Sequence, residues 1–160
     1  LMKGVTPTTT FEGIATADDF VLAIDFTGTA TGPAQFIVAQ EGITETSGAL
    51  ESITQDAQYI RSGKQTIKTG TQRSFTVSGN RYIGDAFQDA LMEHKIKYGT
   101  GQAVVKPYVY FCMLTGKGEK GKISIAIESD HSGAAGENAG ISAKLSAIGR
   151  PEEYTYTTTP

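Results

Sequence analysis

Residues 75–100 read FTVSGNRYIGDAFQDALMEHKIKYGT, and in this stretch the pattern of the chain changes from strand to helix. The first residues alternate between apolar and polar, as a half-buried strand does. After the turn, apolar residues recur at helical spacing. We therefore predict one amphipathic helix over residues 85–98, which packs on the rest of the protein through Ile83, Phe87 and Leu91.

The same predicted helix carries acidic residues at steps of four, namely Asp85, Asp89 and Glu93. Asp85 suits the positive end of the helix dipole. The acidic line is either an ordinary solvated face or a contact for Lys or Arg of a partner, and the sequence leaves both interpretations open.

The rest of the chain has the pattern of short strands separated by glycine. With 160 residues, 39% hydrophobic and 19% charged, the composition favours one folded domain over a disordered chain. Strands are predicted over residues 20–26, 34–40, 64–69, 73–78, 102–114, 122–129 and 141–148. The first of them should bury only one face. Because turns follow at short intervals, we predict a mainly β fold: two packed antiparallel sheets, as a sandwich or open barrel, flanked by the helix.

Three segments flank or interrupt this domain, which we place at residues 20–150. Residues 1–19 are predicted to form an N-terminal arm and residues 151–160 a C-terminal tail. Residues 41–62 lack periodicity yet are partly apolar, so we expect a long loop that is mobile until it orders against a neighbour. The ends are either frayed or pair with other subunits. The residues expected between subunits are Phe11, Ile14, Ile43, Leu50, Ile53, Tyr59, Ile60, Tyr154 and Tyr156.

Charge and cysteine content exclude several classes of protein. The net charge of −3 argues against a surface that binds nucleic acid. The single cysteine, Cys112, excludes an intrachain disulfide. Neither a leader pattern nor a sufficiently long apolar segment is present, so we expect no membrane span and synthesis in a cytoplasm.

No motif in the sequence predicts chemistry. Residues 116–121, GKGEKG, match the letters of a dinucleotide-binding loop, but a strand pattern follows where a helix is required. Asp130, His131 and Ser132 are adjacent, whereas a catalytic triad is assembled from separate segments. Two histidines without paired spacing do not suit a zinc site. We expect no catalytic residues, no cofactor and no metal.

The order and spacing of these elements resemble the major tail protein, or tail tube protein, of long-tailed bacteriophages. The matching features are Gly42-Ile43-Thr44 after a strand, Tyr59 with Gly63, two Thr/Ser-rich strands, Ser78-Gly79-Asn80-Arg81, Gly84-Asp85 before the helix, and the strands at 103–113, 122–129 and 141–148. No single motif is specific, and the match lies in the order of the elements.

The resemblance implies a structural subunit. In that family six subunits share their sheets in a ring, and rings stack into a tube that conducts DNA without binding it specifically. The partners implied are further copies of the chain, a tape measure protein, and tail terminator or tip proteins. The implied location is the tail of a virion made in a bacterial cytoplasm. Residues 1–19 and 41–62 lie where such subunits reach neighbouring rings.

The alternative is a monomeric ligand-binding β-sandwich, such as a carbohydrate-binding module. Such modules usually expose aromatic side chains for sugar stacking, and this chain has no Trp. Most of its Tyr residues lie in predicted strands or in the predicted tail. The size of the protein in dilute solution, followed by electron microscopy at high concentration, would separate the two functions.

Overall fold

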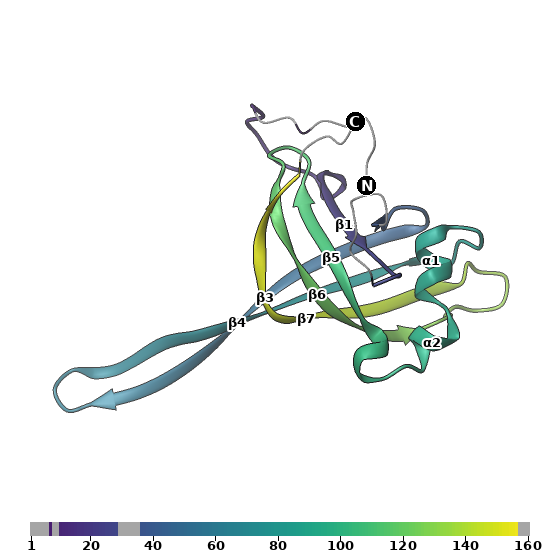
Figure 1. Cartoon of the computed structure of the whole chain (residues 1–160). Coiled ribbons are helices and arrows are strands. Elements are labelled where there is room, and N and C mark those ends of the chain that lie inside the picture. Colours follow the sequence, from purple (N-terminus) through teal and green to yellow (C-terminus); the bar gives the residue numbers. More distant parts are fainter. Residues whose placement is uncertain (1–6, 8–9, 29–35, 157–160) are drawn as a thin grey trace.

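The computed structural model describes residues 7, 10–28 and 36–156, and within them seven antiparallel strands form one sheet (Figure 1). The order across the sheet is β2-β1-β5-β6-β7-β4-β3. The strands are β1 (Phe20–Ile24), β2 (Ile37–Val38), β3 (Ile43–Tyr59), β4 (Gly63–Asn80), β5 (Val105–Cys112), β6 (Lys117–Ser129) and β7 (Gly140–Thr155). The helical elements are η1 (Ala17–Asp19), α1 (Ala86–Leu91), α2 (His94–Lys97) and η3 (Gly101–Val104). The mainly β prediction is confirmed.

The sequence suggested two packed sheets, but all seven strands are hydrogen-bonded into one sheet. This single sheet curls. β4 and β5 are separated by β6 and β7, yet the ring of Phe75 lies 5.0 Å from that of Tyr110 and 5.5 Å from that of Tyr108. The register between β6 and β7 shifts near Lys120 and again near Ser129. Such irregularities bend strands and increase their twist. The curl makes two halves of one sheet face each other.

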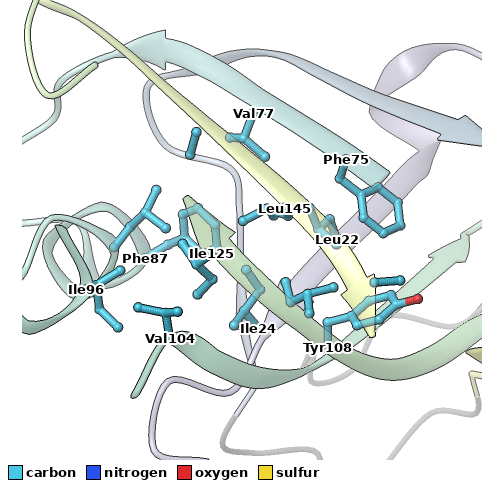
Figure 2. Packing of buried hydrophobic residues seen from close by; sticks show 14 residues of the cluster. Leu22, Ile24, Phe75, Val77, Phe87, Ile96, Val104, Tyr108, Ile125 and Leu145 are labelled. Carbon is cyan, nitrogen blue, oxygen red and sulfur yellow. The ribbon is translucent and has the colours of Figure 1, made fainter. Parts of the chain in front are cut away.

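The main core lies inside this curl. Figure 2 shows Phe87 from α1 beside Ile125 of the sheet, while Phe75 lies at the other end of the same cluster, on the side of Tyr108. The alternation predicted for the late strands is confirmed, since Ile141, Ala143 and Leu145 are all buried. Ile123 and Ile125 are buried as well. One cluster of side chains therefore joins α1 and α2 to the strands of the curled sheet.

β1 differs from its prediction, because both of its faces are buried. Leu22 and Ile24 belong to the main core. Val21 and Ala23 point the other way, into a second cluster with Phe111 of β5. Alternation predicts a half-buried strand, but the residues on the second face of β1 are also apolar, and the chain covers them.

The predicted helix over 85–98 is broken into α1 and α2. The Asp85 carboxylate accepts a hydrogen bond from the Gln88 backbone N–H and starts α1, and Glu93, with extended backbone, starts α2. Phe87 and Leu91 are buried as expected, but Ile83 is 83% exposed. Ile96 of α2 is buried instead, five residues after Leu91, where a continuous helix would turn it to another side. The break lets both helices bury an apolar residue.

The C-terminal residues belong to the sheet rather than to a tail. β7 continues past Pro151, and its last residues pair with Lys117–Lys120 of β6. Tyr156 is 3% exposed, and its ring stacks on that of Phe111 at 4.5 Å. The predicted tail is wrong for residues 151–156, while residues 157–160 lie outside the described part of the chain.

Candidate assembly interface

Residues 41–62, predicted as an irregular loop, contain the whole of β3 and the turn that follows it. β3 pairs with β4 from Ile43 opposite Gly79 to Tyr59 opposite Gly63. The turn contains Arg61 at a φ of 67°. β4 then runs without a break through residues 70–72, although the sequence predicted separate strands at 64–69 and 73–78. Sequence periodicity missed β3 because its side chains are largely exposed on both faces, and apolar alternation signals burial rather than pairing.

We call residues 50–72 the hairpin arm, and the rest of the described protein the body. β4 pairs with β7 only over Ser74–Asn80, so beyond Ser74 the chain continues as two strands alone. Figure 1 shows this ribbon projecting from the curled sheet. Ten residues of extended chain span roughly 30 Å. Because isolated two-stranded ribbons are marginally stable in water, an arm of this length is typical of a segment that meets a partner.

The hairpin arm has an apolar side and a charged side. Alternate residues of a strand share a face, which places Ile53 and Tyr59 together, and Ile67 joins them because it pairs with Gln55. Ile53, Tyr59 and Ile67 are 55%, 50% and 56% exposed. On the other side, the Lys64 Nζ lies 3.2 Å from an Asp56 carboxylate oxygen. The arm therefore presents a stripe of apolar side chains with no cover of its own.

The predicted contact residues separate into three groups in the structure. Leu50, Ile53, Tyr59 and Ile60 lie on the hairpin arm and are exposed. Ile43 packs against the main core, Tyr154 packs against the second cluster, and Tyr156 is buried in that cluster. Phe11 and Ile14, before η1, are 46% and 94% exposed.

Sequence reasoning missed Ile67 as a member of the exposed apolar stripe. It stands alone among polar neighbours in QTIKT, so the composition of its segment gave no warning. A signal was present in the pairing of β4 with β3, but that pairing could be recognised only after residues 41–62 were known to be a strand.

The two ends of the sheet leave strand edges uncovered by β-pairing. β3 is one end, and it pairs with β4 alone. At the other end β2 pairs only with Ala23 and Ile24, and the Leu22 carbonyl accepts a hydrogen bond from the Ala39 N–H. Among the described residues, Phe20 and Val21 of β1 therefore have no strand neighbour on that side. A groove runs between the two ends. Its lining includes Asp18, Phe20, Val21, Val38, Ile43 and Glu45. Uncovered edges of this kind favour pairing with another chain.

Where the arm joins the body, one buried cation is surrounded by partners. The Arg73 guanidinium lies over the rings of Phe75 and Tyr110, 4.5 Å and 4.8 Å from their centroids. Its Nε lies 2.6 Å from a Glu119 carboxylate oxygen on β6. Burial raises the pKa of the neighbouring Tyr108 and Tyr110 hydroxyls, so both stay protonated and neutral at ordinary pH.

The acidic line of the predicted helix is used mainly within the subunit. Asp85 caps α1, and Asp89 accepts a hydrogen bond from Arg81 at 2.9 Å. Glu93 lies 3.1 Å from Lys95 on the surface. Asp85 and Asp89 are therefore already partnered within the subunit.

Two features of the described residues bear on chemistry, namely possible metal ligands and the GKGEKG segment. No group of three or more His, Cys, Asp or Glu side chains among them is close enough to hold a metal ion. Lys117 of the GKGEKG segment begins β6, with no helix after it. In the same part of the chain, no helix is long and apolar enough to span a bilayer.

Comparisons with known proteins identify the fold. No family model matches the sequence, and no curated protein matches it. The structure is similar to a chain from the tail of an empty gene transfer agent particle with C6 symmetry, at a TM-score of 0.68 and 17% identity, covering 89% of this chain and 100% of that one. A chain from the virion of a native gene transfer agent particle gives 0.64 and 16%, with coverage of 89% and 100%.

The third similar structure is the SPP1 tail tube, solved by solid-state NMR and cryo-EM. The TM-score is 0.67 at 16% identity, and the match covers 91% of this chain and 82% of that one. The chain therefore has the fold of phage tail tube proteins, as the sequence resemblance predicted.

Proposed function

We propose that this chain is the structural subunit of a tail tube, in which six copies close a ring and rings stack around a lumen that conducts DNA. The observation that carries the proposal is the hairpin arm: a tail tube fold that extends an amphipathic ribbon roughly 30 Å from its body. A subunit that acted alone would gain nothing from an uncovered apolar stripe on such a ribbon.

Ring closure follows from the open sheet. β3 and the first half of β1 expose backbone groups at the two ends of the sheet. If neighbouring subunits pair these edges, the separate sheets join into a continuous barrel, and closed symmetry removes every edge. Sixfold closure is supported by the C6 symmetry of the similar gene transfer agent tail.

Stacking is assigned to the hairpin arm. Burying a large apolar side chain contributes about 1.5–3 kcal/mol, so Ile53, Tyr59 and Ile67 together supply several kcal/mol for each arm that docks. The backbone of the arm is already paired in the subunit, which lowers the ordering cost that an irregular loop would incur.

The remaining roles follow from the same assignment. The net charge of −3 suits a conduit that DNA crosses without specific binding. We assign the protein no catalytic activity, a place in the virion tail, and contacts with a tape measure protein and with terminator or tip proteins. Synthesis in a bacterial cytoplasm belongs to this proposal as well.

Assembly at high concentration tests the proposal. Purified protein is concentrated and followed by light scattering and negative-stain electron microscopy. Rings or tubes are expected from the unchanged chain. The double variant Ile53→Ser/Ile67→Ser removes two of the three apolar side chains of the stripe and leaves the body intact, so it is expected to form no tubes.

The matched control is Ile83→Ser, which changes an isoleucine of the body that is even more exposed than Ile53 and Ile67. It should assemble as the unchanged chain does. Unchanged protein that stays strictly monomeric at high concentration would contradict the proposal and favour the monomeric ligand-binding module.

A further inference from the structure

We infer that Arg73 is a positioning residue for assembly: clamped by Glu119 and two aromatic rings, it fixes the direction in which the hairpin arm leaves the body. The role of Arg73 in assembly rests on the proposed function, whereas its contacts are present in a single subunit. At the root of the arm, a side chain of β4 contacts strands that are not its neighbours in the sheet.

Backbone pairing alone leaves this root weakly held. β4 is flanked by both β3 and β7 from Asn80 back to Ser74. Arg73 is the next residue, and from there β3 is the only paired strand, with one further side-chain hydrogen bond from Gln72 Nε2 to the Ala147 carbonyl of β7. A ribbon of two strands bends and twists more readily than a wider sheet. Without a further contact, the angle between arm and body would therefore vary.

Arg73 supplies that contact across the inside of the curl. Its side chain, 10% exposed, leaves β4 and reaches Glu119 on β6, passing over Tyr110 on β5. Neither β5 nor β6 pairs with β4. Gly48, on the neighbouring β3, makes room for this path, because a Cβ there would lie 3.2 Å from an Arg73 guanidinium nitrogen. The clamp thus joins the root of the arm to the opposite half of the sheet.

The clamp consists of Arg73 with Glu119, Phe75 and Tyr110, and its contacts restrict the orientation of the arginine side chain. The guanidinium is planar, so stacking on the rings of Phe75 and Tyr110 restricts its orientation as well as its position. Glu119 is paired across the strands with Glu153 of β7, a like charge, so the guanidinium is the compensating partner that its carboxylate needs. A buried ion pair of this kind contributes more to conformational specificity than to stability.

The test measures arm direction in the single subunit. Cys112 is replaced by Ala, and spin labels are attached at Ile60→Cys, at the tip, and Lys144→Cys, on an exposed position of β7. Double electron–electron resonance gives the distribution of distances between the labels. The intact clamp should give a narrow distribution.

The clamp variant is Arg73→Met/Glu119→Leu, which replaces both charges with apolar groups of similar size and so avoids stranding a buried charge. We expect the distance distribution to broaden by about twofold or more while the melting temperature stays close to that of the unchanged chain. The matched control is Arg81→Met/Asp89→Leu, which removes an ion pair of 2.9 Å outside the arm. This control should leave the width of the label-to-label distance distribution unchanged.

An unchanged width in the clamp variant overturns the inference. If that variant fails to fold by circular dichroism, Arg73→Lys takes its place, because lysine keeps the charge and loses the stacked plane. Arg73→Lys should still broaden the distribution, and an unchanged width would overturn the inference just as directly.

Assembly separates this inference from the proposed function. In tube-forming conditions the clamp variant without labels should assemble about tenfold more slowly, because an arm of variable direction is less often oriented for binding to the neighbouring subunit. If the unchanged chain forms no tubes while the clamp variant broadens the distances, the proposed function fails and the clamp stands. If tubes form equally fast with and without the clamp, and the widths agree, the clamp fails and the proposed function stands.

Discussion

β3 and β4 run through both the body and the hairpin arm, and the same two strands behave differently in each. In the body, Phe75 and Val77 of β4 are buried, with β7 as a second neighbour. In the arm, Ile67 of the same strand is more than half exposed, and β3 is its sole neighbour. The comparison teaches that strand pairing and core formation are separate matters, because the arm keeps its pairing without a core. Its apolar groups are consequently available to another molecule.

The largest effect should come from the deepest part of the body. Replacing Phe87, which is fully buried against Phe26 and the main core, by Ala should lower the free energy of unfolding by about 3–5 kcal/mol. Chemical denaturation provides the measurement. Ile83→Ala, four residues earlier and 83% exposed, is the control and should change little.

A smaller loss in the free energy of unfolding is expected at Tyr156, in the C-terminal residues that pack on the body. Tyr156→Ala removes a buried ring that stacks on Phe111, so unfolding should become easier by roughly 2–4 kcal/mol. Thermal and chemical denaturation would both report it. A negligible change would return residues 151–156 to the status of a tail.

The arm should respond in the opposite way. Ile53→Ser/Ile67→Ser, which is expected to abolish tubes, should alter the monomer's free energy of unfolding by less than about 0.5 kcal/mol for each substitution. Amide exchange sharpens the contrast, since arm amides should exchange faster than those of the body in monomers and become protected in tubes. Equal protection of arm and body in the monomer would erase the distinction between the two regions.

The smallest effect concerns pH at the arm. A hydrogen bond from Thr66 and the nearby Lys64 ammonium lower the pKa of Asp56. The Asp56 carboxylate therefore stabilises the arm above its unfolded pKa of about 4, and this contribution is lost as pH falls through the lowered value. An NMR titration should show the depressed pKa rising towards normal in Lys64→Gln. No response would remove Lys64 as a cause.

How far the sequence predicted this structure depended on burial. The alternation at Ile141, Ala143 and Leu145 located β7 because one face of this strand is buried and the other faces solvent. The break at Glu93 was not predictable, since nothing in LMEHK forbids a helix and the tertiary fit of Ile96 decides it. The arm was missed for the reverse reason, since its side chains are exposed on both faces and therefore show no apolar alternation.

For the candidate interface, Leu50, Ile53, Tyr59 and Ile60 are exposed on the arm, whereas Ile43 of the same segment packs against the main core. The role of these residues between subunits stays a prediction. Tyr156 was misplaced because a terminal position resembles a tail in any sequence. Its burial depends on Phe111, more than forty residues earlier, and no local pattern connects the two.

The register shift between Ile53 and Thr54 governs how the reach of the arm can change during evolution. One extra residue of β4 is absorbed there, and this brings Ile67 opposite Gln55, on the same side as Tyr59. Beyond the shift, adding one residue to each strand would reverse every side chain nearer the tip. Only additions of two residues to each strand preserve the sides, so the reach of the arm is quantised in steps of roughly 7 Å. Related chains should therefore differ in arm length by such steps, or carry a compensating shift of register.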